Sequence, residues 1–125
     1  MKKQKRVFDT SVLLSFIKGE RGSAKIAQML EQGLEHRGGI LISSLSIYEL
    51  VAIIGRRNIE KAIAAVAFLE RAGRLIPPAA ETAQNAALLK IKYPGADLSL
   101  ADAIIIQTGI EEGAVTISAP SSMPV

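Results

Sequence analysis

Three carboxylates stand out in this sequence because apolar residues surround them. They lie in the segments Val7-Phe8-Asp9, Ile47-Tyr48-Glu49-Leu50 and Leu100-Ala101-Asp102-Ala103. The chain has no cysteine, which excludes thiol catalysis and thiolate zinc sites. Its only histidine, His36, argues against His-rich metal sites and a Ser-His-Asp triad. Any chemistry must therefore come from carboxylates, hydroxyls and a bound metal ion.

A purely structural role competes with chemistry at each carboxylate. The spacings Ser46-x-x-Glu49 and Ser99-x-x-Asp102 match a helix-capping pattern, and Asp9 can be a plain N-cap. On a helix whose apolar stripe begins at Ile47, Glu49 is expected to point nearly opposite that stripe. The residues expected beside it there are also apolar: Leu45, Ala52 and Ile53. Desolvating a carboxylate among them is costly unless a metal ion or a partner's arginine meets it.

Apolar periodicity predicts strands that alternate with helices. The expected strands are residues 6–8, 40–42, 75–76 and 114–117, and the expected helices are 10–17, 23–38, 43–55, 58–73, 79–93 and 99–112. This alternation predicts a three-layer α/β/α fold with a central parallel sheet of four to five strands. Its length of 125 residues indicates one domain spanning residues 1–125. Asp9 follows the first strand and so lies at the carboxyl edge, where open parallel sheets bind ligands.

The composition is that of an ordinary globular protein with a small basic excess. The formal net charge is +3, and 22% of the residues are charged. Aromatic residues make up only 4%, which argues against a single-strand binder that stacks bases on aromatic rings. No apolar run is long enough for a membrane helix, and no signal peptide is recognisable, so we expect a cytoplasmic protein without a membrane partner.

The three acidic motifs, in this order, resemble the PIN domain family. This metal-dependent ribonuclease fold is used by the toxins of VapBC toxin–antitoxin pairs and by RNA-processing factors. The matching segments are Val7-Phe8-Asp9-Thr10-Ser11, the run from Ile42 to Leu50, and the run from Leu98 to Ile105. The resemblance implies that Asp9, Glu49 and Asp102 are the catalytic, metal-binding acids. It also implies that hydroxyls of Ser11, Thr116 and Ser118 support the site.

The sequence departs from the family pattern after the last expected strand. The family commonly has Thr, any residue, and then Asp or Asn, whereas this chain has Thr116-Ile117-Ser118. Ser118 thus stands where a fourth acid is expected, and its loss should weaken a second metal site more than the first.

Carboxylates without His or Cys select hard cations, so the expected cofactor is Mg²⁺ or Mn²⁺. The resemblance implies hydrolysis of RNA phosphodiester bonds by an activated water, as in the toxin of a VapBC-type pair. The implied partners are RNA, a small antitoxin protein that lies across the acidic crevice, and a second copy of the chain in a homodimer. Arg56 and Arg57 are candidates to contact the RNA backbone, although a solvated helix end explains them equally well.

Other activities stay open. A catalytically impaired PIN module would bind RNA or a protein without cutting, and a PIN nuclease of RNA processing would cut without an antitoxin. Phosphotransferases of the haloacid dehalogenase type also begin with Asp after the first strand. They require a second Asp two residues later, where this chain has Ser11. Response-regulator receivers require an acidic pair that the residues before Asp9 do not supply.

Overall fold

Four short parallel strands form the centre of the molecule. A computed structural model describes residues 4–118 of the chain. The strands are β1 (Arg6–Phe8), β2 (Ile40–Ser43), β3 (Arg74–Ile76) and β4 (Val115–Ile117), in the spatial order β3-β2-β1-β4. Every neighbouring pair is parallel, as predicted. The tail after Ser118, where a fifth strand would fall, lies outside the described residues.

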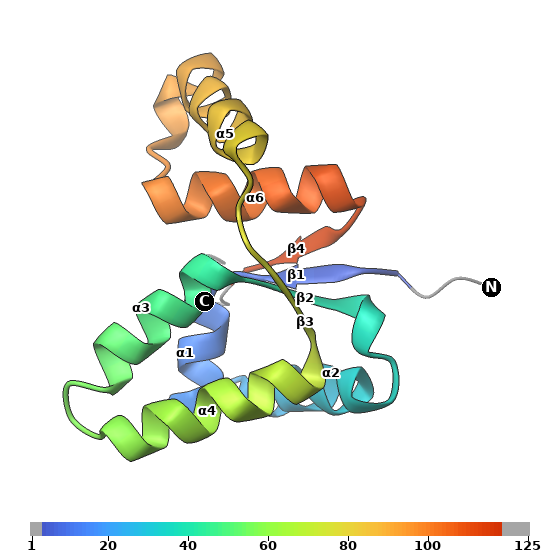
Figure 1. The fold of residues 1–125 in the computed structure, drawn as a ribbon, viewed down its shortest axis with the longest axis vertical. Helices are drawn as coiled ribbons and strands as arrows, with labels where there is room; N and C mark the ends of the chain where they lie inside the picture. The colour runs from blue at the N-terminus through green and yellow to red at the C-terminus, as the bar shows by residue number, and fades with distance from the viewer. Residues whose placement is uncertain (1–3, 119–125) are drawn as a thin grey trace.

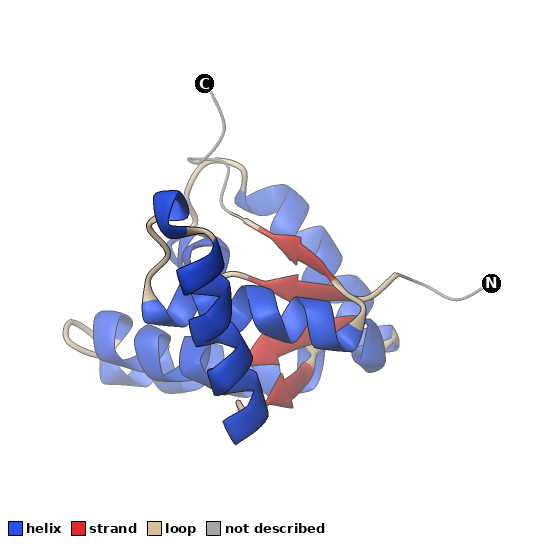
Figure 2. Cartoon of the chain, turned by 90° about the horizontal axis from the view of Figure 1, so that it is seen from above, coloured by secondary structure: helices blue, strands red, loops and turns tan. Residues whose placement is uncertain are grey.

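Helices cover both faces of this sheet. Within the described residues they are α1 (Thr10–Lys18), α2 (Ser23–Glu35), α3 (Ser44–Ile54), α4 (Ile59–Ala72), α5 (Ala80–Lys92) and α6 (Leu100–Glu112). Figure 1 shows α1 to α4 on one side of the strands and α6 on the other, with α5 packed on the outside of α6. Figure 2 gives the same layers from above. The expected three-layer α/β/α architecture is confirmed. None of the helices in the described part of the chain is long and apolar enough to cross a bilayer.

The central strands are apolar on both faces because each face is covered. Successive strand residues point to opposite sides of a sheet. Phe8 and Ile42 accordingly pack into the core formed with α1 to α4, whereas Val7 and Leu41 pack against Ile105 of α6. All five side chains are at most 1% exposed. This two-sided burial explains why the strands are continuous apolar runs in the sequence.

Polar side chains cap the starts of three helices, two of them directly after a strand. Asp9 caps α1, Ser43 caps α3 and Ser99 caps α6, each by accepting a hydrogen bond from a first-turn amide. The capping interpretations of Asp9 and Ser99 are confirmed. The capping interpretation of Ser46 is wrong, because β2 ends at Ser43 and α3 begins three residues earlier than that interpretation requires.

Candidate active site

The ends of β1, β2 and β4 lie side by side at the carboxyl edge of the sheet. The register pairs Val7 with Leu41 and Phe8 with Ile117. The amide of Asp9 continues this ladder by donating to the carbonyl oxygen of Ile117 at 3.0 Å. Asp9 therefore emerges from the middle of the sheet, between the end of β2 and the end of β4.

The first carboxylate, Asp9, is held by its position as a helix cap. Its backbone is extended, and its Oδ1 accepts a hydrogen bond from the amide of Ser11 at 3.2 Å. The side chain is half-buried, and an ionised carboxylate has further lone pairs that this one bond leaves available. Capping and ligand binding are therefore compatible at Asp9. Ser11 is exposed, and the contact it makes with Asp9 comes from its amide.

The second carboxylate, Glu49, is fixed by a chain of hydroxyls. The Oγ1 of Thr10 donates to Oε1 of Glu49 at 2.7 Å and lies 2.8 Å from Oγ of Ser46. A hydroxyl has one hydrogen, so a Thr10 that donates to Glu49 must accept from Ser46. Thr10 and Ser46 are buried, while Glu49 is half-buried. Glu49 is thus aimed at the start of α1, next to Asp9.

This geometry adds two residues to the site. The buried side of α3 includes Ser46, one turn before Glu49, as well as the apolar Leu50 and Ile54. Sequence reasoning missed Thr10 and Ser46 as residues that position Glu49. The available signal was polarity at buried places: Thr10 directly follows the strand acid, and Ser46 precedes Glu49 by three residues.

The third carboxylate, Asp102, comes from the opposite face of the sheet. It lies in the first turn of α6, where its amide donates to Oγ of Ser99 at 3.1 Å. Figure 1 shows α6 and α3 both beginning at the same end of the sheet. The carboxylate of Asp102 is half-buried and has no hydrogen-bond or ion-pair partner within residues 4–118. The structure therefore brings the three acidic positions to one edge, on helices from two layers.

These carboxylates suit a divalent cation by donor type and by charge. All three are half-buried hard oxygen donors, and none forms a salt bridge with a described residue. A cation would relieve the repulsion between acids gathered at one edge. As placed, however, no three Asp, Glu or His side chains of the described residues form a group that could hold a metal ion. The donor chemistry fits Mg²⁺ or Mn²⁺, whereas a closed set of ligands is not preformed here.

The remaining predicted residues occupy different surroundings. Thr116 is half-buried in β4 and its Oγ1 faces α6, where a Cβ added to Gly109 would come within 2.9 Å of it. Ser118 follows β4 and is exposed beside the end of β1. Arg56 and Arg57 are exposed in the turn after α3, at the end of that helix remote from its cap. Their proposed contacts stay predictions.

Three comparisons place this chain among known proteins. The family model for the PIN domain matches residues 6–119. A search of curated proteins found no match. Among solved structures, the chain is similar to VapBC2 from Rickettsia felis bound to a DNA fragment from their promoter. That match has a TM-score of 0.68 and 18% identity, and covers 89% of this chain and 84% of that chain.

A second similar structure is VapC20 from Mycobacterium tuberculosis, described as a Sarcin-Ricin loop cleaving toxin. Here the TM-score is 0.64 at 19% identity, over 88% of this chain and 85% of that chain. At such identities, the two structures establish a shared fold.

Proposed function

Because the chain belongs to the PIN domain family, we propose that it is a divalent-metal-dependent endoribonuclease. The observation that carries the proposal is that the fold brings the positions of Asp9, Glu49 and Asp102 to one edge of the sheet, although their side chains as placed do not form a closed ligand group. All three are half-buried and lack a cationic partner among the described residues. Half-buried carboxylates without a counter-charge are costly to desolvate, and a hard cation would remove that cost.

In the proposed reaction, Asp9, Glu49 and Asp102 hold Mg²⁺ or Mn²⁺. When bound, such an ion withdraws charge from the phosphate and lowers the pKa of water. Thr10 and Ser46 fix the rotamer of Glu49, so that its second oxygen is available at the edge. Histidine is absent from this edge, since His36 is exposed at the end of α2. The carboxylates are therefore the bases available to accept a proton from the attacking water.

Metal binding can be tested without any RNA. An ion that binds only the folded state stabilises it by about 2.7 kcal/mol at a concentration one hundred times its Kd. Millimolar Mn²⁺ should therefore raise the melting temperature of the wild type, and Asp9→Asn should abolish most of that rise. Asp97→Asn, in the exposed loop before α6, is the matched control and should keep it. An unchanged melting curve for the wild type would contradict the metal site.

Ser118 favours a second candidate function, an impaired module that binds RNA without cutting it. One ion with three carboxylates supports hydrolysis, but without a fourth acid the water is less well placed. A misplacement of about 1 Å can cost on the order of a hundredfold in rate. We therefore expect weak cleavage of single-stranded RNA that Ser118→Asp increases and Asp102→Asn removes. Binding of RNA without cleavage by either the wild type or Ser118→Asp would favour the impaired module.

We further propose that the chain is the toxin of a VapBC-type pair. The similarity to VapBC2 and VapC20 supports this role. An antitoxin tail with a basic side chain would complement the unpaired carboxylates at the edge. Expression of the chain alone should slow growth of a bacterial host, and Asp9→Asn should relieve this. A neighbouring short gene with a DNA-binding start would support the pair, and its absence would favour a role in RNA processing.

The same proposal includes a homodimer formed through helices. Large apolar side chains are more than half exposed on four helices: Tyr48 on α3, Ile59 and Ile63 on α4, Leu88 and Ile91 on α5, and Leu100 and Ile110 on α6. A second copy would remove part of this surface from water. Light scattering at tens of micromolar should report twice the monomer mass of 13.3 kDa. A monomer at that concentration would contradict the dimer.

A further inference from the structure

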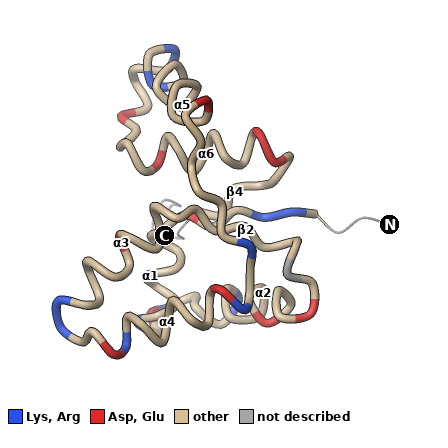
Figure 3. Tube along the Cα trace, viewed as in Figure 1, with Lys and Arg blue, Asp and Glu red and all other residues tan. Residues whose placement is uncertain are grey.

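A basic groove lies at the end of α3 that is remote from its cap. Its volume is about 990 Å³, and four cationic side chains line it: Lys18 from the end of α1, Arg56 and Arg57 from the turn after α3, and Lys61 from α4. No Asp or Glu is among its lining residues. None of the four cationic side chains has an ion pair or a hydrogen bond within residues 4–118. In Figure 3, the blue of Lys and Arg appears at the turn that joins α3 and α4.

The groove shares one face of α3 with Glu49. Its apolar part includes Ala52 and Ile53, which follow Glu49 by three and four residues. Residues at these spacings share a helix face, and the displacement along the axis is about 5–6 Å. Ile53 is 45% exposed, so this face is open to a ligand. A ligand lying along it would meet carboxylates at one end and cations at the other.

We infer that this basic groove binds backbone phosphates of single-stranded RNA on one side of the bond that is cut. The inference rests on the proposed function, which places a scissile phosphate at the carboxylates. An acidic peptide would be attracted by the groove but repelled by the adjacent acids. An RNA strand satisfies both ends, because a divalent ion lies between its phosphate and the acids while the cations take the next phosphates directly.

The chemistry of the groove sets affinity rather than sequence preference. Arg and Lys contacts to phosphate oxygens position a nucleic acid without reading its bases. The one amide there, Asn58, uses its Oδ1 to accept from the amide of Lys61 as the cap of α4. The apolar part contains no aromatic ring on which a base could stack. The groove should therefore hold many RNA sequences equally well.

The test is RNA binding in the presence of a chelator, measured by fluorescence anisotropy with a labelled ten-nucleotide oligouridine. All proteins carry Asp9→Asn, so that no cleavage occurs. Arg56→Gln with Arg57→Gln removes two charges from the groove. Lys90→Gln with Lys92→Gln removes two charges from the exposed last turn of α5 and is the matched control. Melting curves verify that each variant is folded.

The groove variant should bind about tenfold more weakly than its parent. The slope of log K against log salt should fall by about 1.4, because each single-strand phosphate contact contributes about 0.7. The control should keep both the affinity and the slope of the parent. Equal losses in the two variants would overturn the inference, since binding would then follow total charge. Tighter binding of a labelled hexaglutamate than of the RNA would overturn it as well.

This experiment separates the groove from the proposed function. Binding in chelator needs neither metal nor cleavage. The groove variant can therefore lose RNA affinity as expected even if Mn²⁺ does not raise the melting temperature of the wild type. Conversely, if the wild type binds metal but the groove variant keeps the RNA affinity of its parent, the proposed nuclease function is supported and RNA binding by the groove is contradicted.

Discussion

The hydroxyl of Thr10 determines how Glu49 is presented at the sheet edge. A free glutamate side chain on a helix samples several rotamers, and ordering them costs free energy. The short bond from Thr10, supported in turn by Ser46, holds Glu49 before any ligand arrives. Because Thr10 directly follows Asp9, one dipeptide supplies both a carboxylate and the group that orients another.

Replacing Thr10 with valine tests this role. Thr10→Val keeps the shape but leaves the buried Ser46 hydroxyl without its acceptor, which should cost about 1–3 kcal/mol in the free energy of unfolding. The Mn²⁺ concentration needed for half of the thermal stabilisation should also rise, since Glu49 is no longer oriented. Thr10→Ser retains the hydroxyl and is the control. Urea denaturation supplies the first quantity and melting curves the second. Equal behaviour of the valine and serine variants would contradict the role.

Some of these residue roles could be predicted from the sequence and others could not. Asp9 and Ser99 are caps because they stand just before apolar helices, which is local information. The bond from Thr10 to Glu49 joins residues 39 positions apart, so it depends on how α1 and α3 pack. Whether the three acidic side chains converge on one point also depends on how the helices pack. Local motifs identify the three acids but do not specify this convergence, and within the described residues they do not form a three-ligand group.

Among the elements, α6 packs against two neighbours, the sheet and α5. It packs between the sheet and α5, with buried residues on more than one side: Ala103 and Ile104 toward α5, and Ile105 toward β1 and β2. A helix covered on two sides has no single apolar stripe, so its periodicity is weak in the sequence. Its last turn carries Glu111, which accepts hydrogen bonds from Thr82 of α5 at 2.7 Å and from Gln107 at 3.0 Å. The bond from Thr82 joins α5 to the helix that supplies Asp102, whereas the bond from Gln107 lies within α6.

The contact at Glu111 should make stability depend on pH. The hydrogen bond from Thr82, followed by that from Gln107, lowers the pKa of the Glu111 carboxyl against the opposing effect of burial. A carboxyl whose pKa is lowered by folding stabilises the fold above its unfolded value of about 4.5. That stabilisation is lost as the pH falls below 4.5 through the lowered value.

Denaturant midpoints between pH 7 and pH 3 measure this effect. The wild type should lose more stability over this range than Glu111→Gln, whose side chain does not titrate. Glu31→Gln, on the exposed surface of α2, is the control and should follow the wild type. Parallel pH profiles for the wild type and Glu111→Gln would show that the bonds at Glu111 do not favour its ionised form.

For the whole molecule, the layer order follows from the sequence more directly than the surface does. Short apolar strands alternating with helices leave few arrangements, since parallel strands need crossovers of one hand. The order β3-β2-β1-β4 places β1 in the interior, where its last residue is followed by Asp9 at the site. The basic groove was harder to foresee, because it combines the ends of α1 and α3 with the start of α4.

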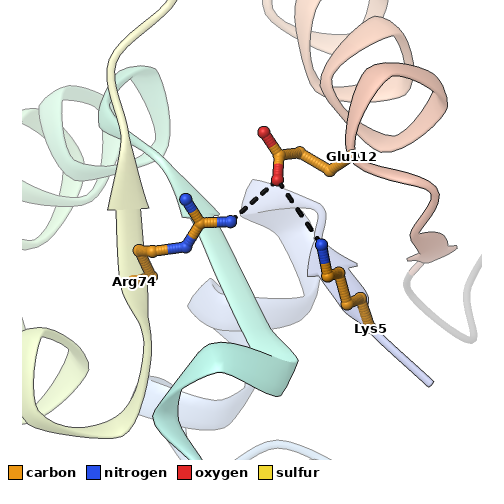
Figure 4. A network of polar contacts seen from close by, with 3 residues as sticks. All are labelled: Lys5, Arg74 and Glu112. Atoms are coloured by element: carbon orange, nitrogen blue, oxygen red, sulfur yellow. Dashed lines mark hydrogen bonds and ion pairs between the residues drawn. The ribbon is translucent and has the colours of Figure 1, made fainter. Parts of the chain in front are cut away.

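One ion-pair network connects three segments that are far apart in the chain. Glu112, at the end of α6, lies 2.7 Å from Arg74 of β3 and 3.9 Å from Lys5, just before β1 (Figure 4). These contacts lie at the amino edge of the sheet, opposite the carboxylates. They join the last turn of α6 to the strands, whereas Asp102 lies in the first turn of the same helix.

Glu112→Gln should show how much this network contributes. The three side chains are 27–48% exposed, so the expected loss at low salt is at most about 1 kcal/mol in the free energy of unfolding. At 1 M salt, where the screening length is about 3 Å, the difference from the wild type should nearly vanish. Urea denaturation at both salt concentrations gives these values, with the exposed Glu35→Gln as the control. A loss of equal size at both concentrations would mean that Glu112 acts through packing or a neutral hydrogen bond. RNA binding in the groove should be unaffected by this variant, because the network and the groove lie on different elements.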